Sequence, residues 1–335
     1  MVHVAVIGAT GAVGRRLVSE LEMISSSVDK LSLFASKRSA GQTLSFRGEQ
    51  ITVQEFDDSS FTDVDYVLMS AGGDFSKEHA RSIVSQGCVV IDNSSAWRQD
   101  QEVSLIVPEV NGRAIQGDHR PRVISNPNCS TIQLVLSVAP LMETFGVRSL
   151  DVSSYQSVSG SGQAGIQDLM QQASACLQGL EIKADHLPKP MAFDVIPAID
   201  RLDASGYCNE EIKIIQETRK ILDAPELPVS ATTIRVPTFV GHGESVTVTL
   251  NQEVTLEQVA QTWGERSYLQ VFQASSYEEL PTLKTCEGSR QVLIVRPRLP
   301  FGAERSSFLT FWNMADNLLV GAATNAVKIL QTILG

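Results

Sequence analysis

The stretch VHVAVIGATGAVG, residues Val2–Gly14, decides the fold of the first part of the chain. Its apolar run, Val2–Ile7, predicts a buried strand, and the pattern after it predicts a helix over Arg15–Leu21. Glycines at positions 8, 11 and 14 give the turn the spacing G-x-x-G-x-x-G. Because glycine lets a ligand approach the backbone and a helix start has unpaired N–H groups, this turn favours a dinucleotide pyrophosphate. The spacing is looser than the commonest fingerprint, so a tight turn without a ligand is the alternative.

Short apolar runs and helical patterns continue to alternate as far as residue 128, which is typical of a parallel α/β sheet. A helix is expected at about Ser76–Gln86. The further strands are predicted at Leu31–Ala35, Asp65–Met69, Cys88–Ile91 and Val123–Ser125. Residues 1–128 are therefore predicted to form a Rossmann-like dinucleotide-binding domain, to which a last helix within residues 316–335 returns.

From about residue 147 the sequence changes to longer stretches in which polar and apolar residues alternate. This pattern predicts a mostly antiparallel sheet. Its strands are predicted at Ser149–Val158, Val229–Val236, Glu244–Leu250, Gln291–Arg298 and Ser307–Met314. A buried helix after Thr131 and helices at Ala164–Leu177, Asn209–Leu222 and Leu256–Trp263 complete a second, α+β domain over residues 129–315. The segment Gly179–Pro197, with three prolines, predicts an irregular excursion toward a partner subunit.

The composition is that of an ordinary globular enzyme. The chain has 335 residues, of which 43% are hydrophobic and 19% charged, which is enough for two domains with sizeable cores. The 38 acidic residues outnumber the 27 basic ones and give a net charge of −11, which argues against a general nucleic-acid binder or a protein held on anionic lipid. No apolar run reaches the ~18 residues of a membrane span, and no basic stretch precedes the first strand. We expect a cytoplasmic protein.

One of the five cysteines is distinguished by its place in the sequence. They lie at positions 88, 129, 176, 208 and 286, and without a Cys-x-x-Cys pair or a histidine at zinc spacing they predict reduced thiols and no metal site. In SNPNCST, Ser125–Thr131, the cysteine Cys129 stands between a strand and the start of a helix. The partial positive charge of a helix start favours the thiolate, so Cys129 is a candidate nucleophile and the other four are expected to be structural.

A nucleophilic cysteine needs a base, usually histidine. Of the five histidines, His242 lies in TFVGHGE, between two predicted strands, where neighbouring glycines leave room for a substrate. The sequence by itself does not bring residues 129 and 242 together.

The end of the second predicted strand bears on the choice of dinucleotide. A site for NAD usually carries an acid about 20 residues after the glycines, to accept a hydrogen bond from the ribose. Here the strand is followed instead by Ser36-Lys37-Arg38-Ser39. An arginine can hold a 2′-phosphate by two hydrogen bonds, whereas a carboxylate would repel it. This pattern favours NADP over NAD, with a solvated basic turn as the alternative.

Taken together, these motifs resemble the aspartate-β-semialdehyde dehydrogenase family, nearly from end to end. The resemblance rests on Gly8–Gly14, Ala35–Gly41, Ser70–Gly73, Asp92–Arg98, Val107–Asn111, Asn126–Cys129, Tyr155–Gly160, Glu210–Lys213, Arg235–His242 and Ala315–Asn317. So many motifs in one order are not expected by chance.

The resemblance implies an NADP-dependent enzyme that works through a thioester. The thiolate of Cys129 would attack the aldehyde, hydride would pass to NADP, and phosphate would release the product as aspartyl phosphate. In the cell the family runs the reverse reaction, for the synthesis of lysine (through diaminopimelate), threonine and methionine. A homodimer is also expected, from the resemblance and from the second domain with its irregular segment.

The same resemblance implies a role for each matching residue. His242 would be the general acid/base and Gln156 would orient the acyl group. Arg235 would bind the substrate carboxylate, with Glu210 at the amino-group side. Phosphate would be bound by Arg98, Lys213 and Asn128. The cofactor would contact Gly8, Thr10, Gly11, Ala12, Val13, Ser36, Arg38, Ser39, Ser159, Gly160 and Asn317.

Two departures from the family pattern are mild. Trp97 stands where Phe is expected, and Gly243 follows the histidine where another small residue is usual.

Three alternative functions stay open. A cysteine hydrolase would have no use for the glycine loop. A catalytically silent paralogue would bind NADP without turnover, although the candidate catalytic residues are all present here. A reductase of N-acetylglutamyl phosphate would not need a site for a free amine.

Overall fold

The computed structural model describes residues 1–24 and 27–335, which form two compact units. The first unit comprises Met1–Asn128 and Ala322–Gly335, and the second comprises Cys129–Gly321. Both combine helices with a sheet, as the alternating patterns predict, so the expected α/β fold with a second α+β domain is confirmed.

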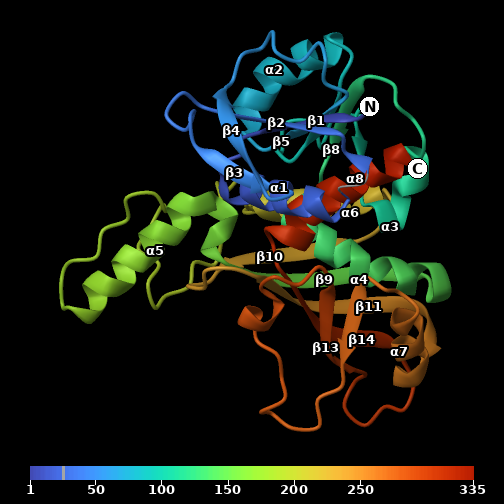
Figure 1. Ribbon diagram of the computed structural model, residues 1–335. Coiled ribbons are helices and arrows are strands. Elements are labelled where there is room, and N and C mark those ends of the chain that lie inside the picture. Colours follow the sequence, from blue (N-terminus) through green and yellow to red (C-terminus); the bar gives the residue numbers. More distant parts are fainter. Residues whose placement is uncertain (25–26) are drawn as a thin grey trace. The chain divides into compact units, whose positions relative to one another are not determined.

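In the first unit the described residues form an eight-stranded sheet in the order β3-β4-β2-β1-β5-β6-β8-β7 (Figure 1). All neighbouring strands are parallel except the β3–β4 hairpin. The strands are β1 (His3–Ile7), β2 (Lys30–Ala35), β3 (Thr43–Phe46), β4 (Glu49–Glu55), β5 (Tyr66–Met69), β6 (Val89–Asp92), β7 (Ser104–Leu105) and β8 (Arg122–Ser125). The helices are α1 (Ala12–Met23), α2 (Gly73–Ser85), α3 (Pro108–Asn111), the short η2 (Gly112–Ala114) and α8 (Thr324–Leu334).

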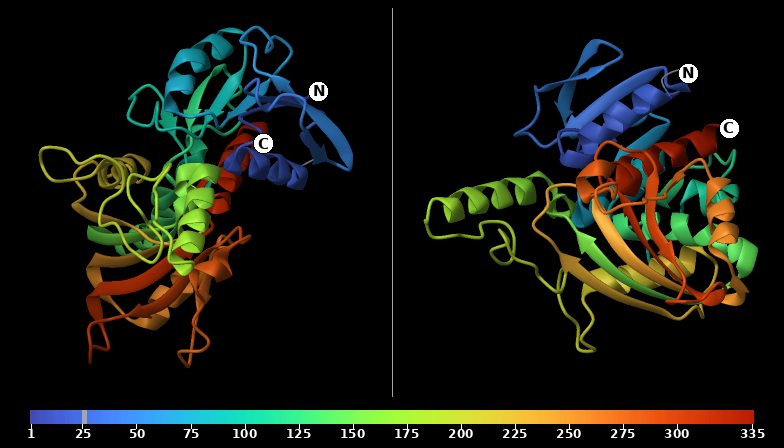
Figure 2. Two further views of the ribbon diagram at one scale, coloured as in Figure 1. Left: turned by 90° about the vertical axis from the view of Figure 1, so that its left-hand side faces the viewer. Right: turned by 90° about the horizontal axis from the view of Figure 1, so that it is seen from below.

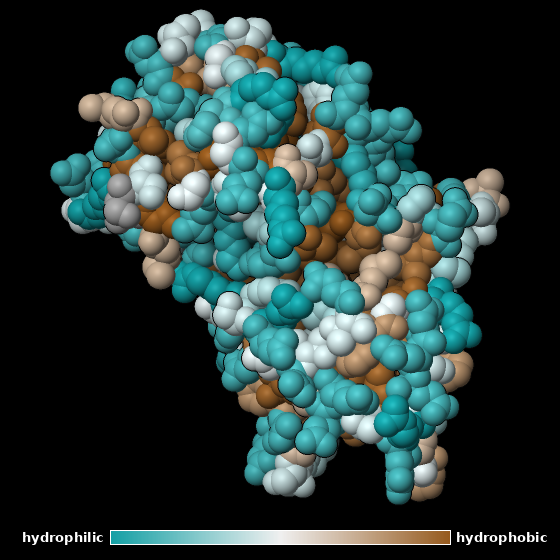
Figure 3. Space-filling view, turned by 90° about the vertical axis from the view of Figure 1, so that its right-hand side faces the viewer, coloured by the Kyte–Doolittle hydropathy of each residue, from teal (hydrophilic) through white to brown (hydrophobic). Residues whose placement is uncertain are grey.

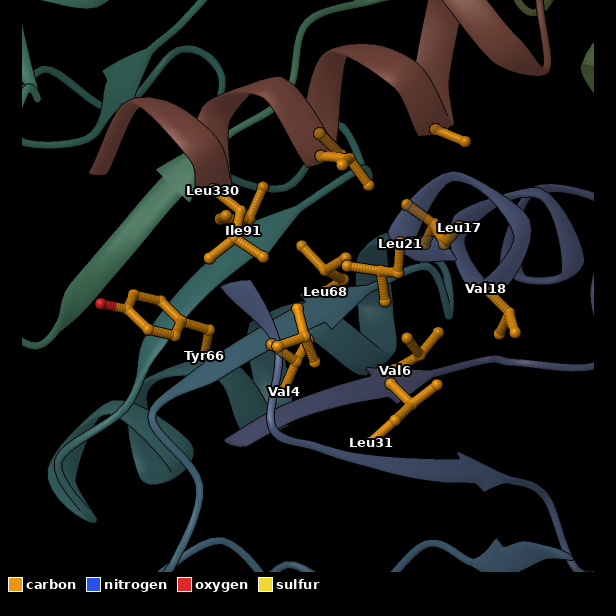
Figure 4. Close-up of a cluster of buried hydrophobic side chains, with 14 of the residues drawn as sticks. Val4, Val6, Leu17, Val18, Leu21, Leu31, Tyr66, Leu68, Ile91 and Leu330 are labelled. Carbon is orange, nitrogen blue, oxygen red and sulfur yellow. The ribbon is translucent and has the colours of Figure 1, made fainter. Parts of the chain in front are cut away.

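Both faces of the central strands β1, β2, β5 and β6 are buried, which explains why these strands are continuous apolar runs rather than alternating ones. On one face Val4, Val6 and Leu68 pack with Leu21 of α1 and with Leu330 of α8 (Figure 4). On the other face the alternate strand residues pack against α2. The C-terminal helix is thus part of the core of the first unit.

In the second unit the described residues form a six-stranded sheet in the order β10-β9-β11-β14-β13-β12. The three central pairs of strands are antiparallel. The edge strands β10 and β12 each run parallel to their neighbour. The strands are β9 (Val147–Gln156), β10 (Val229–Arg235), β11 (His242–Val254), β12 (Leu269–Phe272), β13 (Val292–Arg298) and β14 (Ser306–Ala315). The helices are α4 (Cys129–Phe145), η3 (Val158–Ser161), α5 (Gly162–Leu177), α6 (Asn209–Ile221), α7 (Leu256–Gly264), η4 (Leu283–Cys286) and the π-helical turn η5 (Leu319–Ala323).

Helix α4 is the centre of the second unit. It lies against β9, β11, β13 and β14, and α6 and α7 flank it (Figure 1). Nearly all of its side chains are buried, as its apolar sequence predicts. Trp263 of α7 packs edge-on against Phe311 of β14, and its ring N–H donates to the carbonyl of Ser137 at 2.8 Å. These contacts fix α4 on the sheet that carries the candidate site.

Helix α5 and the chain that follows it extend away from the six-stranded sheet (Figure 2). The irregular chain is held to α5 by buried polar groups, since Asp168 accepts backbone N–H bonds from Asp185, His186 and Leu187. Hydrophilic residues predominate on the face of the molecule drawn in Figure 3, with hydrophobic residues visible between them. Within the described ranges, no helix combines the length and apolar character needed to cross a membrane.

Candidate active site

Three strands of the second unit meet at one end of the sheet, and each carries a polar side chain there. Gln156 is the last residue of β9 and Arg235 the last of β10, and the two are register partners. His242, the first residue of β11, is the antiparallel partner of Gln156. Because partners on neighbouring strands point to the same face, these three side chains form one polar cluster.

Cys129 is the first residue of α4 and is half-buried. Burial lowers the pKa of Arg235, and the negative charges of Glu210 and of the Cys129 thiolate counteract this effect, so these groups act on one another. A guanidinium and a helix start both favour a thiolate. By contrast, burial raises the pKa of Cys88 to about 11 and that of Cys286 to about 12, which keeps both as unreactive thiols.

His242 is held as a neutral ring. Its Nδ1 accepts a hydrogen bond from the backbone N–H of Ser157 at 3.1 Å, so the ring proton belongs on Nε2. Burial lowers the pKa of His242 to about 3, and the charge of Arg235 adds to the lowering. Nε2 is fully buried and has no hydrogen-bond partner among the described residues. This arrangement leaves one nitrogen of the ring available to a bound molecule.

Two glycines keep space open around the cluster. A Cβ on Gly160 would lie 3.0 Å from Nη1 of Arg235 and 3.6 Å from Nε2 of His242. A Cβ on Gly321, in the π-helical turn η5, would lie 2.6 Å from the Cβ of Cys129. A Cβ at position 160 would thus crowd the guanidinium of Arg235 and only touch the imidazole, whereas a Cβ at position 321 would displace the nucleophile.

Asn317 fixes the loop that surrounds His242. Its Oδ1 accepts hydrogen bonds from the Ser159 hydroxyl at 3.0 Å and from the backbone N–H of Gly241 at 2.9 Å. The Ser157 hydroxyl donates to the same oxygen at 3.3 Å. Ser159, Gly160 and Asn317, all expected to contact the cofactor, are thus neighbours in the second unit.

An ion pair lies at the start of α6. Glu210 is buried, and its Oε2 is 3.1 Å from Nζ of Lys213. Nζ is also 3.7 Å from a carboxylate oxygen of Asp200. The charge of Glu210 acts on both Arg235 and His242, so this pair is electrostatically part of the cluster.

Arg98 and Asn128 belong to the first unit and are buried there. The Arg98 side chain donates from Nε to the carbonyl of Asn126 at 3.0 Å and from Nη2 to the carbonyl of Asn93 at 2.8 Å. These carbonyls hold the guanidinium in place, and its charge also lowers the pKa of the buried Asp92 carboxyl against the effect of burial.

The glycine loop of the first unit is built for close packing. Gly8 has a positive φ of 79°, and a Cβ there would lie 2.2 Å from the carbonyl oxygen of Ser70. A Cβ on Gly14 would lie 2.0 Å from the carbonyl oxygen of Gly8. Gly11 precedes α1, and no side chain of the described residues caps this helix start. Thr10, Ala12 and Val13 border the same uncapped end, which suits a phosphate group.

The turn after β2 is exposed at Ser36 and Arg38, and half-exposed at Ser39. The backbone N–H of Ser39 donates to the carbonyl of Ser36 at 2.8 Å, which defines the turn. No group of histidine, cysteine and acidic side chains in the described ranges is arranged to hold a metal ion.

Comparison with known proteins defines the class. Residues 3–117 match the family model "Semialdehyde dehydrogenase, NAD binding domain", and residues 138–320 match "Semialdehyde dehydrogenase, dimerisation domain". The protein is therefore an oxidoreductase of the semialdehyde dehydrogenase class that uses a nicotinamide dinucleotide, acts on a small molecule and forms an oligomer.

Individual relatives narrow this class. The chain is 41% identical to an aspartate-semialdehyde dehydrogenase of Aquifex aeolicus over 99% of its length and 97% of the relative. It is 39% identical to that of Bacillus subtilis over the same shares of the two chains. A solved structure of aspartate semialdehyde dehydrogenase II from Vibrio cholerae, complexed with ASA, has a TM-score of 0.94 at 37% identity and covers 100% of this chain and 98% of that one. The chain belongs to the aspartate-semialdehyde dehydrogenase family.

Several residues around the site were not singled out from the sequence. Ser157 orients His242 through its backbone N–H, and Gly321 makes room for Cys129. Gly243 faces Trp312, whose ring would lie 2.2 Å from a Cβ at that position, so glycine here matches a large neighbour on β14. The backbone contact of Ser157 and the pairing of Gly243 with Trp312, 69 positions away, leave no local signal in the sequence. Gly243 itself was visible as a departure from the family pattern.

Proposed function

We propose that the protein interconverts L-aspartate 4-semialdehyde and L-aspartyl 4-phosphate with NADP, through a thioester on Cys129. The arrangement that supports this most is the cluster in the second unit, where Arg235 is electrostatically coupled to Cys129 and to a neutral His242. The cell would use the direction that reduces the acyl phosphate, in the cytoplasm and as a homodimer, toward lysine, threonine and methionine.

Each step of the proposed reaction uses a group with suitable chemistry. The Cys129 thiolate adds to the aldehyde carbon, and the Nε2–H of His242 would donate a hydrogen bond to the alkoxide oxygen that forms, keeping its proton. After hydride loss the acyl group remains on sulfur, where Gln156 at the end of β9 would orient it. Phosphate oxygen then attacks the acyl carbon, the C–S bond breaks, and the thiolate is regenerated.

The cationic residues fit the two charged ends of the substrate. Arg235 would hold the substrate carboxylate, while Arg98, Lys213 and Asn128 would hold phosphate. Fixing both ends positions the reacting carbonyl between them. Glu210 would face the ammonium group, and this favours a free amino acid over an N-acylated substrate, which has no ammonium to pair with a buried carboxylate.

The residues of the first unit fit NADP. The uncapped start of α1 and the tightly packed glycine loop suit a pyrophosphate. Exposed Arg38, with Ser36 and Ser39 beside it, suits a 2′-phosphate. When bound, NADP accepts the hydride that the substrate loses.

The proposed activity is tested by mixing the protein with aspartate semialdehyde, NADP and phosphate and recording NADPH formation. We expect turnover that needs all three and that falls by several orders of magnitude in Cys129→Ser, because an alkoxide is far less available than a thiolate. Cys176→Ser, an exposed cysteine on α5, is the control. NADP binding without turnover would instead identify a silent paralogue, and turnover of N-acetylglutamate semialdehyde alone would identify the related reductase.

A further inference from the structure

Glu244 is a carboxylic acid in the interior of the second unit that the reaction above does not use. It lies two residues after His242 on β11 and is fully buried. Side chains two apart on a strand share a face, so Glu244 points to the same side of the sheet as His242. Its register partners are Ser154 on β9 and Asn313 on β14, both buried.

The surroundings of Glu244 connect the sheet with α4. The amides of Asn313 and of Gln133 face its carboxyl group, but neither reaches hydrogen-bond geometry with it. Gln133 donates from Nε2 to Oδ1 of Asn313 at 3.0 Å, and Asn313 donates from Nδ2 to Oγ of Ser137 at 3.0 Å. Glu244 therefore lies against a chain of amides and a hydroxyl that runs from β14 along one turn of α4.

No cation neutralises this carboxyl among the described residues of the elements around it. Strand β14 has no charged residue. The others have exposed charges at Glu143 of α4, at Arg148 and Asp151 of β9 and at Glu253 of β11. The other buried titratable group of β11, His242, is neutral. Burial therefore raises the pKa of Glu244 to about 8, and the amides of Asn313 and Gln133 offset this rise only in part.

A proton on Glu244 would also give hydrogen-bond partners to buried oxygens that lack them. Both carboxyl oxygens and Oε1 of Gln133 are buried without a partner among the described residues. All three are acceptors when the acid is ionised, whereas the protonated acid supplies a donor. An unmade hydrogen bond is costly in a buried site, so the neutral acid is the form that this cluster stabilises.

The spacing along each element links this cluster to the reacting groups. Gln133 lies four residues after Cys129, on the same face of α4 and one turn further on. Glu244 lies two residues after His242. We propose that Glu244 is a positioning residue which, as a neutral acid between Gln133 and Asn313, fixes α4 against β11 and so sets Cys129 relative to His242. This inference rests on the proposed function only in assigning the reaction to those two residues.

The test compares Glu244→Gln, which keeps a neutral group of the same size, with Glu244→Ala, which removes the contact. Glu253→Gln, at an exposed position of the same strand, is the control. We expect E244Q to keep nearly the wild-type kcat and E244A to lose about 10- to 100-fold in kcat with the KM values for semialdehyde and NADP little changed, because a misplaced nucleophile slows chemistry rather than binding.

Two readouts do not depend on turnover. The rate at which iodoacetamide alkylates Cys129 should change in E244A and stay at the wild-type value in E244Q. The infrared band of a protonated carboxyl should be present in the wild type at neutral pH and absent in E244Q. If the wild type proves inactive, these two measurements still decide whether Glu244 is neutral and coupled to Cys129.

The proposal is wrong if E244A keeps the wild-type kcat and alkylation rate, or if E244Q is as impaired as E244A, since the charged form would then be needed. A missing infrared band also overturns it. Should E244A fail to fold, Gln133→Ala removes the same connection from the α4 side and is expected to give the same loss of kcat.

Discussion

The half-buried charge of Arg235 acts on the groups that would perform the chemistry. Burial lowers the pKa of His242 to about 3, and the Arg235 guanidinium adds to this effect. The ring is therefore neutral at any ordinary pH while Arg235 is unpaired with substrate. A substrate carboxylate bound to Arg235 would offset its charge and raise the pKa of the His242 ring in the complex above its value in the unbound protein.

This coupling gives a prediction for Arg235→Gln. Removing the charge should raise the pKa of His242, but not to the ordinary value of 6.5, because burial is the larger cause and remains. The pKa can be followed by NMR of histidine-labelled protein, with Arg219→Gln on α6 as a control cation. An unchanged pKa of His242 in R235Q would show that the two residues are not coupled.

Glu244 gives a prediction for the pH dependence of stability. Its pKa is raised from 4.5 to about 8, so between these pH values the folded state keeps a proton that the unfolded state has released. The stability of the wild type should therefore fall relative to that of E244Q by about 1.4 kcal/mol per pH unit in this window, and the difference should level off outside it. Urea unfolding followed by tryptophan fluorescence measures both proteins across the window. Parallel pH profiles of the two proteins would contradict the shift.

The exposed Arg38 gives a third prediction, on cofactor choice. Arg38→Leu should weaken NADP binding by roughly 1.5–3 kcal/mol, the size of a charge-assisted hydrogen bond, and should change NAD binding little. Lys37→Leu, the exposed neighbour, is the matched control. Titration of each variant with both dinucleotides gives the comparison, and equal losses for the two cofactors would show that Arg38 does not read the 2′-phosphate.

Among the helices and strands, the sequence predicts best those that are buried on all sides. The parallel strands of the first unit are apolar runs buried on both faces, and α4 is apolar all round, so both are visible as patterns. The β3–β4 hairpin was missed because β4 is mostly exposed and has little apolar pattern. Its turn residues, Arg47 and Gly48, both have positive φ, for which only the glycine leaves a signal in the sequence.

For the candidate site, the sequence indicates the single residues but not how they come together. The sequence points to Gln156, Arg235 and His242 one by one, through local motifs. It does not show that they are register partners, because the order of β10, β9 and β11 in the sheet depends on packing across about 80 residues of chain. The Glu244 cluster was missed for a related reason, since its members come from three elements and are ordinary residues in their own segments.

The π-helical turn η5 gives a prediction about an element. Gly321 lies in this turn against Cys129, and an added Cβ would lie 2.6 Å from the cysteine Cβ. Gly321→Ala should therefore displace the start of α4 and lower kcat by about 10- to 100-fold. Gly264→Ala, at the end of α7 where a Cβ meets open space, should leave kcat unchanged. Steady-state kinetics give kcat for the two variants. Wild-type activity in G321A would mean that η5 shifts to accept the added Cβ and leaves Cys129 in place.

At the scale of the whole molecule, the second unit has apolar side chains that are exposed in the single chain. Met170 and Leu177 are exposed on α5, seven residues apart and so on one face of the helix. Leu180 and Phe193, in the chain that follows, are also exposed. Exposed apolar side chains gathered on one projecting segment are typical of an interface between subunits, and residues 138–320 match a dimerisation domain.

We therefore expect light scattering to report twice the chain mass of 36.4 kDa at micromolar concentration. The double substitution Met170→Glu and Leu177→Glu should shift the protein toward the monomer, because each dimer would bury four added carboxylates at its interface. Gln171→Glu adds a charge on α5 without removing apolar surface and should leave the dimer intact. A monomeric wild type would reject the homodimer, and a dimer unaffected by the double substitution would move its interface away from α5, for example to the face of the six-stranded sheet opposite α4, where Phe308 is exposed.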